Sequence, residues 1–191
     1  VVTGVQAALN PHDSIITAYR GHGHMRGAGI EARAVMAELT GRQAGMSKGK
    51  GGSMHMADTS KNMWGGHAIV GGHLPIAAGF ALGDQYAKND NVTICMFGDG
   101  ATNIGYFHEA LNLAKTWGLR VLWVCENNQY AMGTSVARTS KTLDIYKLAD
   151  AYEMPADSVD GMSPEDVHNA VLRAVNRARE KGGPTLLEIK T

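Results

Sequence analysis

Two short polar turns, Gly98-Asp99-Gly100 and Asn127-Asn128, carry residue types that could bind a metal and an anion. A carboxylate and an amide oxygen are hard oxygen ligands of the kind that Mg²⁺ accepts while phosphate oxygens stay in its coordination shell. The glycines allow a backbone to approach an anion closely. The two turns together predict a magnesium-bridged diphosphate site, provided that the fold brings Asp99 and Asn128 together.

A strand, a crossover helix and a second strand would bring the two turns together. Residues 92–97 and 119–125 are short apolar runs, typical of parallel strands that are covered on both faces. An apolar stripe between them predicts the helix: Phe107, Ala110, Leu111 and Ala114. Parallel strands end at the same edge of a sheet, so Asp99 and Asn128 are expected to meet there. The free N–H groups of residues 101–104, at the start of this helix, are expected to face the same anion.

The rest of the chain continues the alternation of strands and helices. Strands are predicted at 14–18 and 185–189, and helices at the start of the chain and at 32–39, 74–87, 143–152 and 164–178. Residues 41–72, with nine glycines in 32 positions, show little regular pattern, and 131–142 are polar; both are predicted as loops. This pattern predicts an α/β fold: a doubly wound, mainly parallel sheet with helices on both faces.

Bulk composition limits the classes of function. The 191 residues are 44% apolar and fit a single domain over residues 1–191. Lys plus Arg equals Asp plus Glu at 18 each, so no basic field would recruit nucleic acid or an anionic membrane, and no run of about 18 apolar residues predicts a membrane span. Cys95 and Cys125 fall in predicted buried strands and are interpreted as core thiols of a reducing compartment. The sequence lacks an initiating Met and a visible targeting segment and stops directly after a strand, so we expect a fragment of a longer protein.

A second polar segment, Tyr19-Arg20-Gly21-His22-Gly23-His24, follows the first predicted strand. The guanidinium fork of Arg20 could pair with a phosphate. His22 and His24 could be active-site contacts, residues of a plain loop, or a metal pair, although no third ligand lies at a supporting spacing. No P-loop occurs, and no G-x-G-x-x-G follows a first strand, so nucleoside triphosphate and nicotinamide binding lack support. The methionines of the glycine-rich segment are predicted to be flexible packing residues at an interface or against a cofactor: Met46, Met54, Met56 and Met63.

Gly98-Asp99-Gly100, followed after 26 residues by Asn127-Asn128, is similar to the signature of thiamine-diphosphate enzymes. Two ordinary polar turns on a flavodoxin-like sheet are the alternative for this pair alone. Further motifs, in order, resemble the alpha subunit of the first component of 2-oxo acid dehydrogenase complexes, with pyruvate dehydrogenases the most similar. They cover essentially the whole chain: ITAYRGHG (16–23), GKGGSMHM (49–56), IVGGHLPIAAG (69–79), GDGATN (98–103), HEALNLA (108–114), CENNQYAMGTSV (125–136) and VDGM (159–162).

The resemblance implies a cofactor, partners and a reaction. Thiamine diphosphate would be held through magnesium, with its pyrimidine half in a separate beta subunit that supplies an activating glutamate. A small 2-oxo acid would be decarboxylated, and the acyl group would pass to the lipoyl domain of an acyltransferase component. Cytoplasm or mitochondrial matrix is the location expected for such a subunit.

The family roles fall on named positions of this sequence. Asp99, the Asn128 side chain and the backbone carbonyl of Tyr130 would bind magnesium. The expected cofactor contacts are Tyr19 and Arg20 on the diphosphate, Gly98, Gly100 and Ala101 through the backbone, Ala68 and Val70 on the aminopyrimidine, and Met132 nearby. His22 would line the catalytic funnel.

Two positions depart from the pattern: Ala68 stands where many relatives have Gly, and Ile104 where many have Gln. The family also carries a histidine-bearing loop that would follow Thr191. An acetoin or branched-chain 2-oxo acid dehydrogenase subunit, and a cofactor-binding domain without turnover of its own, are the alternative functions. Tyr-Arg-Gly-His rather than His-Arg-Gly-His at 19–22 favours pyruvate over acetoin.

Overall fold

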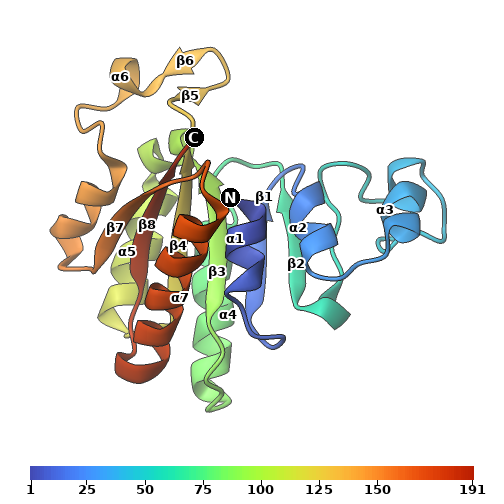
Figure 1. The fold of residues 1–191 in the computed structure, drawn as a ribbon, viewed down its shortest axis with the longest axis horizontal. Helices are drawn as coiled ribbons and strands as arrows, with labels where there is room; N and C mark the ends of the chain where they lie inside the picture. The colour runs from blue at the N-terminus through green and yellow to red at the C-terminus, as the bar shows by residue number, and fades with distance from the viewer.

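The computed structural model describes all of residues 1–191 and has a six-stranded sheet at its centre (Figure 1). Its strands, in sheet order, are β2 (Met63–His67), β1 (Ser14–Ala18), β3 (Thr93–Gly98), β4 (Val121–Asn127), β8 (Thr185–Lys190) and β7 (Ala156–Asp160). Each neighbouring pair is parallel, so all six carboxyl ends lie at one edge. The predicted parallel α/β architecture is confirmed.

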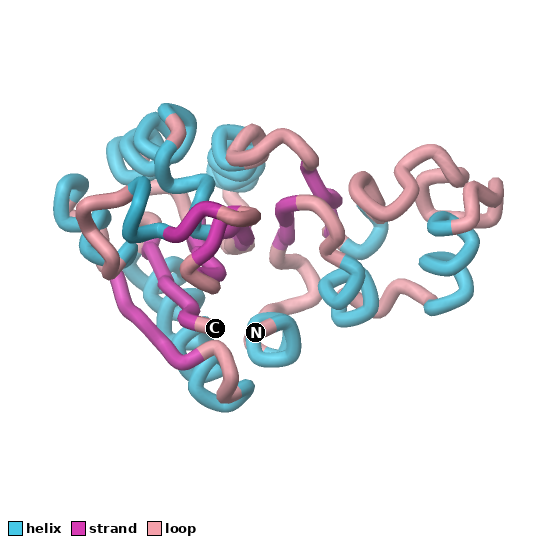
Figure 2. Tube along the Cα trace, turned by 90° about the horizontal axis from the view of Figure 1, so that it is seen from above, coloured by secondary structure: helices cyan, strands magenta, loops and turns pink.

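Helices cover both faces of this sheet, as the view from above shows (Figure 2). Side chains of α1 (Val2–Ala7) and α7 (Pro164–Lys181) share one buried cluster with Ile94 and Met96 of β3. Those of α4 (Leu74–Tyr86), α5 (Gly105–Thr116) and the 3-10 helix η3 (Ile145–Tyr152) share the other with Cys95 and Phe97. Successive residues of a strand point to opposite faces, so β3 feeds both cores. Packing of these two apolar layers against the sheet fixes the positions of the strand ends.

The segment between β1 and β4 also contains regular structure that the sequence analysis did not predict. Residues 22–27, where no helix was predicted, form the short helix α2 (His22–Gly27), which precedes α3 (Ala32–Leu39). The predicted loop over 41–72 contains the 3-10 helix η1 (Thr59–Lys61) and strand β2. Together, α2, α3 and their loops extend beyond the β2 edge of the sheet (Figure 1).

The carboxyl edge of the sheet carries its own small elements. The predicted loop over 131–142 is partly regular: β5 (Tyr130–Ala131) and β6 (Thr134–Ser135) form an antiparallel hairpin, followed by α6 (Val136–Thr139). The hairpin stands over the end of β4 (Figure 1). Residues 99–103 form the 3-10 helix η2 (Asp99–Asn103), and α5 begins only at Gly105. The prediction that residues 101–104 open the crossover helix was therefore wrong, because a separate 3-10 turn intervenes.

Burial confirms that both cysteines are core residues, and it corrects part of the interpretation of the methionines. Cys95 and Cys125 are buried and unpaired. Met56 and Met63 belong to the core, whereas Met54 is 40% exposed. No helix combines the length and the apolar character needed to span a membrane.

Candidate active site

The border between β1 and β3 is where the direction of chain winding changes. From β1 the chain continues to β2 on one side, and from β3 it continues to β4 on the other. In open α/β sheets such a switch point, at the carboxyl ends of the strands, is the usual ligand site. Tyr19 and Arg20 follow β1, and Asp99 follows β3, so the two polar segments predicted from the sequence flank this border.

Asp99 is the acidic residue of this edge. Its residue is 3% exposed, and its Oδ2 atom has no hydrogen-bond partner. Burial raises the pKa of its carboxyl group, although the backbone N–H groups of Asp99 itself and of Asn128 act in the opposite direction. A buried acceptor without a partner is costly unless a ligand satisfies it. The carboxylate therefore fits a cation at the end of β3.

The amide turn lies beside Asp99, because Gly98 pairs with Glu126 on the neighbouring strand. The backbone N–H of Tyr130 donates to Asn128 Oδ1, 2.9 Å away, and that of Gln129 donates to Asn127 Oδ1, 2.8 Å away. Asn128 is exposed, and the Tyr130 N–H occupies only one of the two lone pairs of its amide oxygen. The turn needs a left-handed residue, which is Gln129 at φ 69°. The turn thus holds an amide oxygen close to the buried carboxylate.

Gly100 joins this edge to the hairpin above it. A Cβ at Gly100 would lie 2.6 Å from the Cβ of Ala131, so only glycine allows the hairpin to pack this closely. Ala101, the next residue, is buried within η2. Gly98 faces open space, as expected for a position where a ligand approaches the backbone. Met132, 96% exposed at the hairpin tip, has almost no contact within the chain.

The residues after β1 form a second polar cluster. The Arg20 guanidinium carbon lies 5.0 Å from the centre of the Tyr19 ring, and both side chains are exposed. Arg20 has φ 60°, a conformation that costs energy for a non-glycine residue and is common at binding sites. His22 begins α2, and its Nε2 lies 2.8 Å from Ser53 Oγ. His24 is buried, and no three His, Cys, Asp or Glu side chains form a metal group, so the His22–His24 metal pair gains no support.

Ala68 and Val70 follow β2, and the next residue, Gly71, lies against Ile104, directly after η2. Ala68 is half-buried, Val70 is 55% exposed, and Ile69 between them is 73% exposed. The chain itself leaves these apolar groups uncovered. They are available to a ligand or to another subunit.

Two buried carboxylates near these segments escaped the sequence analysis. Glu188 of β8 accepts a hydrogen bond from Asn127 Nδ2 at 2.7 Å, and Glu38 of α3 binds the glycine-rich loop. Both residues are 0% exposed. The available signal was an acidic residue on an apolar surface: Glu188 stands between Leu187 and Ile189 in a buried strand.

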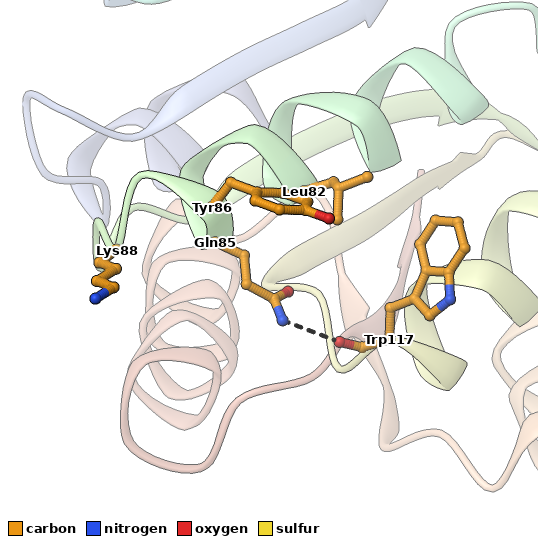
Figure 3. Close-up of a pocket in the computed structure, with 5 residues that line it drawn as sticks. All are labelled: Leu82, Gln85, Tyr86, Lys88 and Trp117. Carbon is orange, nitrogen blue, oxygen red and sulfur yellow. Dashed lines mark hydrogen bonds between the residues drawn. The ribbon is translucent and has the colours of Figure 1, made fainter.

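An open pocket at the other end of α4 is separate from these segments (Figure 3). Five residues line it, with Gln85 Nε2 donating to the Trp117 carbonyl at 3.4 Å: Leu82, Gln85, Tyr86, Lys88 and Trp117. It contains no carboxylate and lies at the C-terminal end of α4, whereas the predicted site residues follow the carboxyl ends of the strands. We assign no chemistry to it.

The chain matches one known family along its whole length. The model of the dehydrogenase E1 component family matches residues 1–191. The chain belongs to the dehydrogenase E1 component family. The family resemblance inferred from the motifs is therefore confirmed.

Individual E1 relatives align along the entire chain. The pyruvate dehydrogenase E1 component subunit alpha of Rhizobium meliloti (strain 1021) is 48% identical over 191 residues, which are 100% of this chain and 55% of the relative. The alpha subunit of the acetoin:2,6-dichlorophenolindophenol oxidoreductase of Bacillus subtilis (strain 168) is 47% identical, with 100% of this chain and 57% of the relative covered. The E1 chain thus spans little more than half the length of these curated relatives.

Solved structures share the fold of this E1 chain at low sequence identity. Benzoylformate decarboxylase from Polynucleobacter necessarius superposes with a TM-score of 0.66 at 13% identity, over 99% of this chain and 32% of that one. A chain from Mycobacterium smegmatis, named as a thiamin diphosphate-dependent enzyme, gives 0.66 at 18% identity, over 100% and 30%. These likenesses confirm the parallel α/β fold.

Proposed function

We propose that this chain is the part of a 2-oxo acid dehydrogenase alpha subunit that binds the diphosphate end of thiamine diphosphate through Mg²⁺. The observation that carries the proposal is the buried Asp99 carboxylate with its unpartnered Oδ2, next to the amide turn at the switch point of the sheet. A divalent cation satisfies that oxygen and brings phosphate oxygens to the same place. Membership of the dehydrogenase E1 component family supports the choice of cofactor.

The metal ligands in this proposal are Asp99 Oδ2, Asn128 Oδ1 and the backbone carbonyl of Tyr130. All three are hard oxygen donors, which is the set that Mg²⁺ prefers. The Asp99 carboxylate supplies the negative charge. The hydrogen bond from the Tyr130 N–H fixes the Asn128 amide so that its oxygen stays at the turn.

The remaining predicted residues would surround the cofactor. Tyr19 and the Arg20 guanidinium would bind the diphosphate, with backbone N–H groups of Gly100 and Ala101 and the open backbone at Gly98. Ala68 and Val70 would pack against the aminopyrimidine, Met132 would cover the cofactor from the hairpin, and His22 would face the substrate. When bound, thiamine diphosphate supplies the electron sink for decarboxylation of the oxo acid. The chain's own residues orient the cofactor and keep it anchored.

Partners complete this proposal. A beta subunit would bind the pyrimidine half and supply the activating glutamate, and a lipoyl domain of an acyltransferase component would accept the acyl group. The exposed Val70 and Met132 are groups that a second subunit or the cofactor would cover. Pyruvate is the proposed substrate.

Acetoin is the second candidate, favoured by the Bacillus subtilis relative at 47% identity. Dye reduction by the full-length protein with its beta subunit, Mg²⁺ and thiamine diphosphate separates the two substrates. Activity with pyruvate and not acetoin supports the first proposal, and the reverse result supports the second.

Calorimetric titration of thiamine diphosphate, with and without Mg²⁺, tests the binding site itself. We expect tight binding only with Mg²⁺, and its loss in Asp99→Ala with the fold retained by circular dichroism. Asp90→Ala is the matched control, because Asp90 is exposed before the amino end of the same strand. Undiminished affinity in Asp99→Ala would refute the metal assignment. Binding without turnover in the presence of the beta subunit would instead identify a cofactor-binding domain alone.

A further inference from the structure

The glycine-rich loop after α3 is organised around one buried carboxylate. Glu38 Oε2 accepts hydrogen bonds from the backbone N–H groups of Ser47 and Gly49, both at 2.9 Å. Its Oε1 accepts from Gly51 at 2.7 Å and from Gly52 at 3.1 Å. Four backbone donors from six consecutive residues thus converge on a single side chain.

No basic side chain pairs with this carboxylate. None of the ion pairs in the structure includes Glu38, although the residue is 0% exposed. Burial would raise the pKa of the Glu38 carboxyl group, but the four N–H groups outweigh burial and hold the pKa below its usual value. A buried carboxylate persists only with such compensation. The loop and the charge therefore depend on each other.

Glycines allow the loop to wrap this tightly. A Cβ at Gly51 would lie 3.2 Å from Glu38 Oε1 and would collide with the His55 carbonyl, and one at Gly45 would collide with Glu38 Oε2. Gly49 and Gly52 have φ of 75° and 57°, in the region that favours glycine. A loop so rich in glycine loses much conformational entropy on ordering. The four charge-assisted hydrogen bonds offset that loss.

The ordered loop ends at a contact with the candidate active site. Ser53 directly follows Gly52, and its Oγ and carbonyl oxygen lie 2.8 Å and 3.1 Å from His22 Nε2. His22 is the residue proposed to face the substrate. The Glu38 side chain on α3 thus binds residues 47–52, and the next residue, Ser53, contacts the imidazole of His22.

We infer that Glu38 is a positioning residue, which folds the 47–52 loop around its carboxylate so that Ser53 holds the imidazole of His22 in place. The inference rests on the proposed function only for what His22 does; the positioning itself is a property of this chain. Glu38 acts through the backbone N–H groups of the loop and is assigned no contact with the cofactor or the substrate.

Three variants of the full-length protein with its beta subunit test the inference. In Glu38→Gln the amide keeps one acceptor oxygen but turns an NH₂ group towards two N–H donors, so the loop should open. Ser53→Ala removes the hydroxyl partner of His22 and leaves the Glu38 bonds intact. Glu31→Gln is the matched control, because Glu31 is the exposed residue that precedes the same helix and makes no cap hydrogen bond.

Two measurements on these variants are independent of catalysis. Hydrogen–deuterium exchange reports how well ordered residues 47–52 are. Carbethoxylation by diethyl pyrocarbonate, detected by peptide mass spectrometry, reports how accessible the imidazole of His22 is to the reagent. The peptide 21–26 also contains the buried His24, which serves as the internal reference. We expect Glu38→Gln to accelerate both processes by about tenfold or more, the factor implied by the loss of one charge-assisted hydrogen bond. Ser53→Ala should accelerate only the modification of His22, and Glu31→Gln should accelerate neither.

A wild-type rate of His22 modification in Glu38→Gln, or wild-type exchange of its loop, would overturn the inference. If Glu38→Gln does not fold, hydrogen–deuterium exchange of the wild-type protein tests the inference instead. The Gly49 and Gly51 amides must then exchange more slowly than those of Gln43 and Ala44, which have no partner in the structure. Equal rates would refute the positioning role. If the expected pattern appears but thiamine diphosphate does not bind, the proposed function fails and the positioning role stands.

Discussion

Asn127 donates its side-chain N–H to the carboxylate of Glu188, 2.7 Å away, in the buried layer beneath the amide turn. The second oxygen of Glu188 accepts from the backbone N–H of Tyr146 at 3.1 Å. Asn127 in turn accepts from Gln129, so a carboxylate on β8 sets the conformation of a turn on β4. Asn128, the proposed metal ligand, lies within that turn and not in the buried network.

Replacement of Glu188 by Ala should weaken both the fold and the site. It leaves the Asn127 amide and the Tyr146 N–H without partners, which should lower the free energy of unfolding by about 2–3 kcal/mol. The affinity for thiamine diphosphate with Mg²⁺ should also fall, because the turn loses its support. Urea denaturation and calorimetry measure the two effects. Glu180→Gln, at an exposed position of α7, should change neither, and an unaltered stability of Glu188→Ala would contradict the role of this network.

The glycines on either side of Asp99 should respond differently to the same methyl group. Gly100→Ala places a Cβ against Ala131, so the hairpin must move, with an expected cost of about 1–3 kcal/mol. Gly98 has an extended conformation, with φ −84°, and open space in front of it, so Gly98→Ala should fold normally. If a diphosphate approaches that backbone, Gly98→Ala should nevertheless bind the cofactor more weakly. Thermal unfolding and calorimetry on the pair distinguish packing from ligand contact, and equal melting temperatures would argue against the tight hairpin contact.

Asp99→Asn should make the metal-free protein more stable. The raised pKa of the Asp99 carboxyl group means that the folded state disfavours its ionised form, so at neutral pH the charge destabilises the protein. Removing the charge should raise the free energy of unfolding by roughly 1 kcal/mol. Adding Mg²⁺ and thiamine diphosphate should reverse the order, since only the wild-type protein gains stability from binding. Melting temperatures of both proteins, measured with and without Mg²⁺ and thiamine diphosphate, would show this reversal of the stability order. A variant less stable than the wild type in both conditions would count against a cation site.

The sequence was sufficient for the part of the fold that strong hydrophobic patterns specify. β3, α5 and β4 lie where their apolar residues predicted, and parallel pairing brought Asp99 and the amide turn to one edge. β2 and β7 were missed. Both are edge strands with a single neighbour, and neither has the apolar pattern of a central strand. β2 contains Gly65 and Gly66, and β7 is mostly polar.

The supporting network of the site was harder to predict than its ligands. Asp99 and Asn128 belong to a motif with a recognisable spacing, whereas Glu38 acts on backbone N–H groups, which every residue except proline carries. Which donors it binds depends on the path of a glycine loop, and glycine permits many paths. Only the acidic residue on an apolar helix face was visible: Glu38 lies three positions after the buried Val35.

His73, at the start of α4, should make stability depend on pH. Its Nε2 lies 2.8 Å from the Met96 carbonyl, and its ring stacks on His67 at 5.9 Å. Burial lowers the pKa of His73 to about 4, with the hydrogen bond to Met96 opposing and the charge of His67 assisting. The unfolded chain keeps the ordinary value of 6.5, so between these pH values it binds a proton that the folded state does not.

The contribution of His73 is therefore fully present above pH 6.5 and is lost as the pH falls towards 4. The free energy of unfolding should decrease in that window by at most about 1.4 kcal/mol per pH unit from this residue. His73→Gln retains an N–H donor for Met96 but does not titrate, so its stability should decline less steeply. His12→Gln, at an exposed position, is the control. Urea titrations at several pH values measure the slopes, and parallel curves for His73→Gln and the wild type would show that His73 is not the group responsible.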